Sequence, residues 1–404
     1  NMKNTKKLLS LLLVIAMIFA LAVPAFAEGE TPSMAGKTVI VHSNDVHGAI
    51  AGYANIAALA AEDESQGAKV IVADAGDFSQ GKVEGSSNKG LNAVKMMDAA
   101  GYDVATLGNH EFDYGYAQLK ENLKEATFST ICCNILDENG KPAFEGSKVF
   151  DIDGLKVGFI GVNTPESQTK ANPALIKGLT WLAGDDMVKA VQAEADKLKA
   201  DGTDVIVVLS HLGVDSESKP NRSTDLWAGL KGVDFIIDGH SHTVMENKQV
   251  YDAAGKAVTL TQTGSYLANV GKMTLAEDGT ITTELISTAD VSDAAVAATA
   301  ATWIKEVDEM LGEKIAVADT KFYITDPATG KRRIRSGETN LGDFVADGIY
   351  TYFNEIEELH CDIAIMNGGG IRTDVEAGPW SFKTCKTVSP FGNVACLWSV
   401  AGQQ

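Results

Sequence analysis

Apolar and polar positions follow one another along the chain in blocks that are typical of an α/β protein. Helical periodicity is present in three segments: 90–100, 116–126 and 185–200. A strand pair is indicated at 149–162, around the turn Asp153-Gly154. A meander is indicated at 258–286, with a turn at Asp278-Gly279. Short apolar runs without alternation predict five buried parallel strands: 38–41, 69–73, 104–106, 205–209 and 235–237.

The chain of 404 residues is long enough for two domains with separate cores. An Ala-rich stretch without Gly or Pro, at 291–311, predicts a helix that links them. The segments beyond it are strand-like 314–317, a basic stretch at 331–335, a helix over 340–353, and strand-like 362–366 and 394–400. We therefore expect a first domain at 37–290, a linker helix at 291–312 and a second domain at 313–404.

Acidic, amide and imidazole residues follow each of the five predicted parallel strands. The motifs are Asn44-Asp45-Val46-His47-Gly48, Gly76-Asp77-Phe78, Gly108-Asn109-His110-Glu111-Phe112-Asp113, Ser210-His211-Leu212-Gly213 and Asp238-Gly239-His240-Ser241-His242. Five of the seven histidines of the chain lie in these motifs. Because the loops at the carboxyl ends of parallel strands line a common crevice, we expect the motifs to converge on one site.

The residue types in these motifs are those of a metal cluster. Asp45 and His47 are separated by one residue, so both can reach one cation in a loop that leaves a strand. Carboxylate and amide oxygens mixed with imidazoles suit Mn²⁺, Fe²⁺, Co²⁺ or Zn²⁺ better than Ca²⁺. The candidate ligands, which suffice for two ions that polarise a phosphoryl group and activate water, are Asp45, His47, Asp77, Asn109, His211, His240 and His242.

His110 directly follows a candidate ligand and is itself free for acid–base chemistry. It can protonate a leaving oxygen, and Asp113, three residues further on, can fix its tautomer. Taken singly, such residues are more often structural: His42 and His360 are expected in the core or at the surface, and Asp77 alone is typical of a turn. The joint occurrence in five loops after strands favours the metal site.

The first 27 residues are typical of a secretory signal peptide. Lys3, Lys6 and Lys7 precede an apolar run at 8–23, and Ala25-Phe26-Ala27 forms a cleavage site of small residues. Cleavage would remove three lysines and no acids, which takes the net charge from −20 to −23. We therefore expect a secreted protein at the periplasm or cell surface of a bacterium, with no membrane span after cleavage.

Composition narrows the partners and the redox chemistry. The acidic surface argues against nucleic-acid polymers and leaves a small molecule as the expected substrate. Cys132 and Cys133 are predicted to be buried strand residues. Cys361, Cys385 and Cys396 leave one disulfide open without selecting a pair, and no C-x-x-C motif indicates a thiolate zinc site.

The motifs around Asp45, Asn109 and His240 resemble signatures of the calcineurin-like metallophosphoesterases, and more narrowly of the secreted 5′-nucleotidases. The resemblance runs from Lys37 to the end of the chain. It implies a four-layer αββα sandwich with a dinuclear site, in which Asp77 bridges and His110 and Asp113 form the catalytic pair. One metal would be held by Asp45, His47 and His242, and the other by Asn109, His211 and His240. Many members have Gln or Asn at the position of His242.

The second domain resembles the substrate-binding domain of the same family. Asn367, Gly369 and Arg372 of the Asn-Gly-Gly-Gly-Ile-Arg motif match positions that contact the nucleotide in the family, as does Arg335 upstream of the motif. Phe391 matches one of two rings that sandwich the base. The family domain continues roughly as far again and carries the second ring there. We therefore expect a second, incomplete α/β substrate-binding domain with a half-built pocket, an exposed apolar face and open strand edges.

The resemblance implies metal-dependent hydrolysis of nucleoside 5′-monophosphates, with UDP-sugar hydrolysis left open as a further activity. The alternative within the class is a 2′,3′-cyclic-nucleotide 2′-phosphodiesterase with 3′-nucleotidase activity. Its first motif usually reads Thr-Thr-Asp-Leu-His, whereas this chain has His-Ser-Asn-Asp-Val-His at 42–47. An alternative of another class is a non-catalytic surface binding protein. That alternative predicts lost ligands, and none is lost here.

Overall fold

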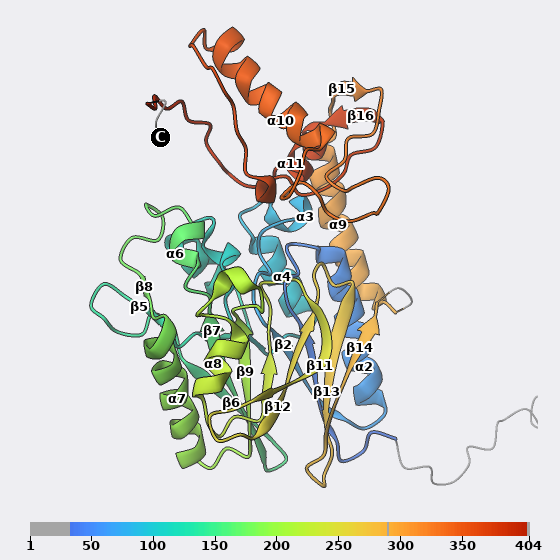
Figure 1. The fold of residues 1–404 in the computed structure, drawn as a ribbon. Coiled ribbons are helices and arrows are strands. Elements are labelled where there is room, and N and C mark those ends of the chain that lie inside the picture. Colours follow the sequence, from blue (N-terminus) through green and yellow to red (C-terminus); the bar gives the residue numbers. More distant parts are fainter. Residues whose placement is uncertain (1–32, 289–290, 402–404) are drawn as a thin grey trace, which may run out of the picture.

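Two six-stranded β-sheets lie face to face with helices on both outer sides (Figure 1). The computed structural model describes residues 33–288 and 291–401, so the predicted signal peptide lies outside the described residues. Between the sheets, Ile40, Ile71 and Met273 of one sheet pack with Phe159 and Val207 of the other. This apolar layer, together with one helix layer on each side, confirms the expected four-layer αββα sandwich.

The first sheet has the strand order β14-β13-β1-β2-β3-β4. Its parallel strands are β1 (Thr38–Ser43), β2 (Lys69–Asp74), β3 (Val104–Ala105) and β4 (Ser129–Thr130). The antiparallel strands β13 (Asn269–Leu275) and β14 (Ile281–Ser287) extend it beside β1. The helices that pack on its outer side are α2 (Tyr53–Ser65), α4 (Leu91–Ala99) and α9 (Ala294–Leu311).

The second sheet has the strand order β11-β12-β10-β9-β7-β6. Its four central strands are parallel: β7 (Leu155–Asn163), β9 (Val205–His211), β10 (Phe235–Ile237) and β12 (Ala257–Thr263). The edge strands β6 (Ser147–Ile152) and β11 (Val244–Tyr251) are antiparallel to their neighbours. The helices α7 (Gly184–Ala200) and α8 (Ser223–Gly229) bury Met187, Val191 and Trp227 against its outer face.

The meander predicted over 258–286 is wrong in its first part. β13 and β14 form the hairpin around Asp278-Gly279, but β12 belongs to the other sheet, where it pairs with β10. The chain crosses between the sheets at 264–268, where Tyr266 and Leu267 adopt positive φ. Local sequence does not contain this information, because β13 pairs with β1, at the start of the domain.

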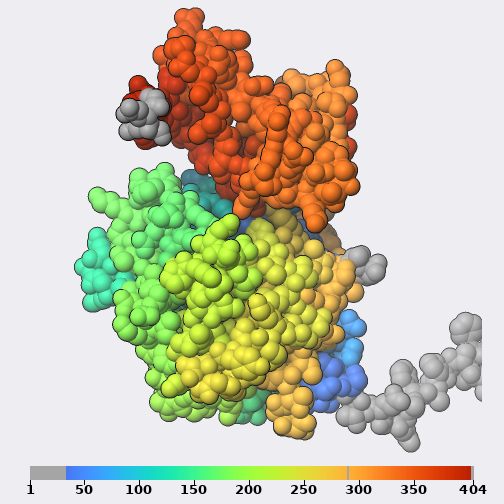
Figure 2. All heavy atoms as spheres, in the orientation of Figure 1, coloured from blue at the N-terminus to red at the C-terminus, as the bar shows by residue number. Residues whose placement is uncertain are grey.

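The second unit, coloured orange to red, lies over one edge of the sandwich (Figures 1 and 2). It contains β15 (Lys314–Ala318) paired with β16 (Gly378–Ser381), then α10 (Asn340–Thr351), which continues as the π-helical η4 (Tyr352–Ile356), and α11 (Phe382–Val388). The glycine loop forms a short 3-10 turn, η5 (Gly368–Gly370). Its small core consists of Ile324, Leu341, Ile371, Trp380 and Val388.

Two strands predicted in this unit are absent from the described chain. The segments 362–366 and 394–400 have strand-like sequences, but no described strand pairs with them. Without a neighbour that covers them, Ile363, Ile365 and Trp398 are 79–85% exposed. The expected exposed apolar face is therefore present.

The remaining elements connect these layers. They are η1 (Ile50–Gly52), α3 (Val83–Ser86), η2 (His110–Phe112), α5 (Tyr116–Lys124), β5 (Ile135–Leu136), α6 (Ser167–Lys170), β8 (Thr180–Trp181) and η3 (Ser216–Ser218). No described helix is long and apolar enough to cross a bilayer. All five cysteines are free, so no disulfide joins Cys361, Cys385 or Cys396. Cys132 and Cys133 are buried as predicted, but they lie in the connection between β4 and β5 rather than in a strand.

Candidate dinuclear metal site and its surroundings

All seven candidate ligands lie at the ends of parallel strands, on one edge of the sandwich. Asp45 and His47 follow β1, Asp77 follows β2 and Asn109 follows β3 of the first sheet. The second sheet contributes His211, the last residue of β9, and the two histidines that follow β10, His240 and His242. The carboxyl ends of the parallel strands of both sheets meet at this edge. The ligand loops therefore converge as expected, but they come from two sheets instead of one.

The first group of ligand atoms comes from Asp45, His47 and His242, which all lie within 4.8 Å of one another. The Nε2 atoms of His47 and His242 are 2.9 Å apart. Oδ1 of Asp45 lies 3.7 Å from Nε2 of His47 and 3.4 Å from Nε2 of His242. Two imidazole nitrogens and one carboxylate oxygen therefore face the same small space.

The second group comes from Asp77, His211 and His240, whose ligand atoms are equally close. Oδ2 of Asp77 lies 3.0 Å from Nε2 of His211 and 4.0 Å from Nε2 of His47. The Asp77 carboxylate thus stands between the two groups, which is the position that a bridging ligand requires.

Hydrogen bonds fix the orientation of two imidazoles. Nδ1 of His211 donates to the carbonyl of Ala75 at 2.7 Å, and Nδ1 of His47 donates to the carbonyl of Gln80 at 2.9 Å. With Nδ1 as the donor, Nε2 is the ring nitrogen that points into the cluster, as in metal-bound histidines. The ring of His240 is held through its other nitrogen: Nε2, rather than Nδ1, contacts Oε2 of Glu166 at 3.2 Å.

An unsatisfied polar atom tests whether these residues fit metal ions. Oδ1 of Asn109 is fully buried and lacks a hydrogen-bond partner. A buried polar atom without a partner is costly unless something else satisfies it. Asn109 belongs to the candidate ligand set, and an amide oxygen is a donor that binds divalent cations. The donor set therefore fits the two ions that the sequence predicts.

Electrostatics indicate the same demand for positive charge. Burial raises the pKa of Asp77, but His211 and His110 reverse this and hold it well below its usual value. Burial lowers the pKa of His211, yet the carboxylates of Asp77 and Asp45 raise it to about 10. Protons on imidazoles thus balance the buried carboxylates, and divalent cations would replace these protons on binding.

The backbone of the site is strained at most of the ligands. Asp45, His47, Asp77, His240 and His242 all have positive φ, between 49° and 74°. Non-glycine residues rarely adopt this conformation, which persists where the surrounding structure enforces it and is frequent at functional sites. Gly76 beside them has a φ of +91°, and a Cβ there would lie 2.5 Å from the backbone of Gly108.

His110 and Asp113 form the expected pair beside the cluster. Nδ1 of His110 lies 2.7 Å from Oδ2 of Asp113, and its backbone amide donates to Oδ1 of Asp77 at 2.8 Å. Burial lowers the pKa of His110, but Asp77 and Asp113 overcome this effect and raise it to about 8. The imidazole is therefore placed and charged as a general acid requires.

The structure divides the predicted substrate contacts into two groups. The Phe391 ring stacks on the His110 ring, with centroids 5.4 Å apart, and the Arg372 guanidinium carbon lies 5.7 Å from the Phe391 centroid. Arg335 lies instead beside the glycine loop, with its guanidinium next to Gly369, and Asn367 precedes that loop. Arg372 and Phe391 thus contact the catalytic edge, and Arg372 also reaches the glycine loop, where its Nη1 donates to the carbonyl of Gly369 at 3.4 Å.

Sequence reasoning missed three residues that support the site. Glu111 accepts hydrogen bonds from four backbone amides, those of residues 77, 78, 79 and 108. Glu166 contacts His240, and this contact holds the pKa of Glu166 below its usual value. Tyr266, in the crossing between the sheets, lies 5.5 Å from His47 between ring centroids. Glu166 follows the end of β7, so the pattern of polar loops after strands could have identified it.

Comparison with known proteins identifies the fold and the family. Residues 38–244 match the calcineurin-like phosphoesterase family model, and residues 314–404 match the 5′-nucleotidase C-terminal domain. The chain belongs to the calcineurin-like phosphoesterases. These matches confirm the expected combination of a metallophosphoesterase domain with a 5′-nucleotidase C-terminal domain. They also confirm that the chain is a phosphoric monoester hydrolase.

The chain covers different shares of the relatives that it matches. It is 29% identical over 90% of its length to the Bacillus subtilis trifunctional nucleotide phosphoesterase protein YfkN, but spans only 27% of that protein. A 5′-nucleotidase of Vibrio cholerae is 27% identical, with 91% of this chain and 74% of that protein covered. The crystal structure of a 5′-nucleotidase precursor from Thermus thermophilus has a TM-score of 0.76, 27% identity, and coverage of 88% and 74%.

Proposed function

We propose that this chain hydrolyses nucleoside 5′-monophosphates to nucleoside and phosphate with the help of two divalent metal ions. The observation that carries the proposal is the stacking of Phe391 on His110. It places an aromatic ring of the second unit directly beside the predicted general acid. A flat base or sugar held by that unit therefore lies next to the ligand cluster. The Vibrio and Thermus relatives, a 5′-nucleotidase and a 5′-nucleotidase precursor, support the same activity.

In this proposal the seven ligand residues hold the two ions, whose identity among Zn, Mn, Fe and Co stays open. Such ions would polarise the phosphoryl group and supply an activated water. His110 donates its proton to the departing ribose oxygen, and Asp113 holds the imidazole in the required orientation. Arg372 offers a forked donor to the phosphate or to the base stacked on Phe391.

Export is part of the proposal. The signal-like sequence at 1–27 supports it, as does the word precursor in the name of the Thermus relative. We also retain the division into a catalytic domain at 37–290, a linker helix at 291–312 and a nucleotide-binding domain at 313–404.

Phosphate release from AMP, UDP-glucose and 2′,3′-cyclic AMP tests the activity. We expect rapid release from AMP that EDTA abolishes and Mn²⁺ restores. A preference for 2′,3′-cyclic AMP would favour the cyclic phosphodiesterase, and release from UDP-glucose would add sugar-nucleotide hydrolysis. If no substrate is turned over at any metal loading, the chain is a binding protein and the proposal is wrong.

A further inference from the structure

His242 is a candidate ligand whose conformation needs support from outside the ligand cluster. Its φ is 53°, in the left-handed region that a non-glycine residue keeps only where the surrounding structure enforces it. Its side chain is 34% exposed. Among the described residues, the hydrogen-bond and ion-pair contacts of its imidazole are with other ligands, His47 and Asp45. The backbone around His242 must therefore be held by other groups.

Gln262, at the carboxyl end of β12, holds that backbone on both sides. Its Oε1 accepts a hydrogen bond from the backbone amide of Thr243 and another from the hydroxyl of Ser241, the latter at 3.1 Å. Ser241 and Thr243 are the two neighbours of His242 in the chain. One oxygen atom thus fixes the residue before and the residue after the left-handed position.

The amide nitrogen of Gln262 holds the start of the same loop. Nε2 donates to the carbonyl of Gly239 at 2.9 Å and to Oδ2 of Asp238 at 3.1 Å. Gln262 is fully buried, and a side-chain amide offers two donors and two acceptor positions. All four are used, and all four partners lie in the loop 238–243. The orientation of the amide follows from its backbone partners, because an N–H can only donate and a carbonyl can only accept.

Thr263, the next residue, is joined to a ligand loop of the first sheet. Oδ1 of the buried Asn44 accepts hydrogen bonds from the backbone amide and from the hydroxyl of Thr263, each at 2.8 Å. Nδ2 of Asn44 donates to Oδ2 of Asp45 at 2.7 Å. The end of β12 therefore connects one loop of each sheet, the loop with Asp45 and the loop with His242.

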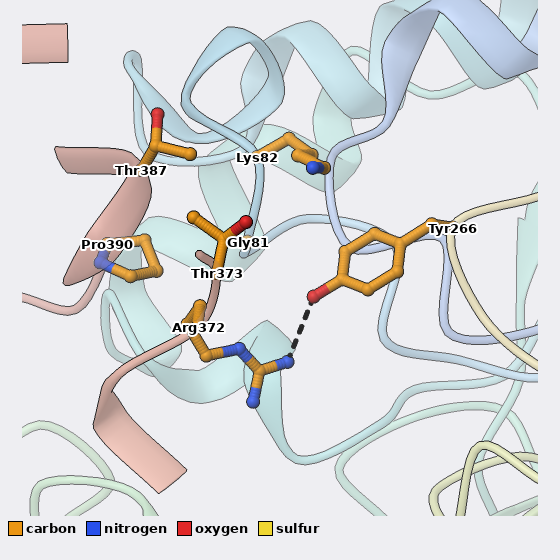
Figure 3. A pocket seen from close by; sticks show the side chains of 7 residues that line it. All are labelled: Gly81, Lys82, Tyr266, Arg372, Thr373, Thr387 and Pro390. Atoms are coloured by element: carbon orange, nitrogen blue, oxygen red, sulfur yellow. Dashed lines mark hydrogen bonds between the residues drawn. The ribbon is translucent and has the colours of Figure 1, made fainter. Parts of the chain in front are cut away.

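Gln262 projects from a part of the chain that is itself well fixed. It pairs with Met245 of β11, so it belongs to the second sheet. Beyond it, the backbone amide of Tyr266 donates to the carbonyl of Asp45 at 2.8 Å. The Tyr266 hydroxyl accepts a hydrogen bond from Nη2 of Arg372 in the second unit, at 3.2 Å (Figure 3). A side chain on such a rigid element can define the geometry of a loop that it contacts.

We propose that Gln262 is a positioning residue that holds His242 in the conformation needed to bind one of the two ions, the one assigned to the group of Asp45. Gln262 contacts no ligand atom and acts through the backbone on either side of His242. His240, in the same loop, has a separate contact with Glu166, so the other ion depends less on Gln262. The inference rests on the two-metal site of the proposed function, but not on the identity of the substrate.

Titration of the metal-free chain with Mn²⁺ tests this role. Gln262→Met keeps the length of the side chain and removes all four hydrogen bonds. We expect one ion to bind as in the wild type and the other about 10–100-fold more weakly, the range for residues that orient ligands. Where the wild type is fully loaded, electron paramagnetic resonance should show a spin-coupled ion pair, but isolated ions in Gln262→Met. Two ions at wild-type affinity, or equal weakening of both, overturn the proposal.

Asn122→Leu separates positioning from a general loss of stability. Asn122 is a buried amide on α5 that bonds to the side chain of Gln118 and to the carbonyl of Lys89, neither of which lies in a ligand loop. This variant should lower the free energy of unfolding in urea and still bind both ions at wild-type affinity. If it also loses one ion, the effect of Gln262→Met is one of stability, and the proposal is wrong.

A second variant decides the question if Gln262→Met does not fold. Ser241→Ala removes one of the four hydrogen bonds and should weaken the same ion by a smaller factor. Unchanged binding of both ions in Ser241→Ala then overturns the proposal. The titration uses no substrate: a wild type that binds two ions but does not hydrolyse AMP refutes the proposed function, and the role of Gln262 is still decided. A wild type that binds fewer than two ions refutes the metal assignment and this inference with it.

Discussion

His110 differs from His47 and His211 because a carboxylate, rather than a backbone carbonyl, holds its Nδ1. Asp113 accepts at 2.7 Å, whereas Nδ1 of His47 and His211 face carbonyl oxygens. A carboxylate stabilises the protonated imidazole, whereas a carbonyl holds a proton on Nδ1 and leaves Nε2 directed at the cluster. The residue types and spacing predicted this division of roles. The structure adds the partners that explain it.

Replacing His110 by Ala should slow AMP hydrolysis about 10²–10⁴-fold, the usual range for loss of a general acid. The loss should be smaller with p-nitrophenyl phosphate, whose leaving group needs little protonation. Steady-state kinetics on both substrates measure the difference, with the exposed His360→Ala as the control. Equal losses on both substrates would show that His110 positions phosphate rather than donating a proton.

His42 is the clearest source of pH-dependent stability outside the metal cluster. It is fully buried, neither ring nitrogen has a hydrogen-bond partner, and burial lowers its pKa to about 3. The folded state therefore excludes a proton that the unfolded chain binds below its pKa of 6.5. The stability associated with neutral His42 is present above that pH and is lost as the pH falls toward 3.

Between pH 7 and pH 5 this residue should lower the free energy of unfolding by about 2 kcal/mol. The variant His42→Gln cannot titrate, so its urea-unfolding free energy should fall less over the same interval. The comparison uses the difference between the two pH values in each protein, which removes the constant cost of the substitution. Parallel pH profiles for wild type and variant would rule out His42 as the cause.

The loops after β2 and β3 depend on one buried carboxylate. Glu111 accepts hydrogen bonds from the backbone of Asp77, Phe78, Ser79 and Gly108 at 2.6–3.0 Å, and from the Ser79 hydroxyl. It thereby joins the loop that carries Asp77 to the loop that carries Asn109. The sequence predicted both loops as sources of ligands, but the partners of Glu111 lie more than thirty positions away, apart from Gly108. Only the packed sheet shows the connection.

Glu111→Gln should weaken metal binding about 10–100-fold, the range found for residues that orient ligands. The amide NH₂ of Gln cannot accept a hydrogen bond, so at least two buried donors lose their partner, at about 1–3 kcal/mol each. Metal titration and urea unfolding measure the two effects. Glu121→Gln, at an exposed position on α5, is the control. Unchanged metal affinity in Glu111→Gln would contradict this role.

Strand prediction succeeded where the pairing partners are near in sequence or the strand is fully buried. β1, β2, β9 and β10 were predicted because their apolar runs are continuous. The division of these strands between two sheets was not visible, since β12 and β13 look like one meander but pair with different partners. The segment 362–366 shows the opposite error: its composition is that of a strand, yet no described strand pairs with it.

The two units contact each other at the catalytic edge. Nε2 of Gln80 donates to the carbonyl of Pro390 at 3.1 Å, and Lys383 forms an ion pair with Glu84 at 2.7 Å. With Phe391 on His110, these contacts place the second unit within reach of a substrate at the ligand cluster. The family resemblance implied a substrate role for Phe391, but not that its ring would pack on His110.

Phe391→Ala should reduce the preference for AMP over p-nitrophenyl phosphate about tenfold, because stacking on an aromatic ring contributes about 1–3 kcal/mol per base. The ratio of kcat/KM values for the two esters measures this preference. Phe382→Ala removes a half-exposed ring from α11 of the same unit and should leave the ratio unaltered. If Phe391→Ala keeps the full preference for AMP over p-nitrophenyl phosphate, the base binds elsewhere.

The metal content of the reconstituted chain tests the central claim that seven residues at the ends of the strands hold two divalent ions. Metal-free protein is loaded with Mn²⁺, freed of excess metal by gel filtration and measured by mass spectrometry of the bound metal. We expect two ions per chain in the wild type and in His360→Ala. Asp77→Ala should lose both, because Asp77 stands between the two ligand groups. Two ions retained in Asp77→Ala, or fewer than two in the wild type, would contradict the dinuclear site.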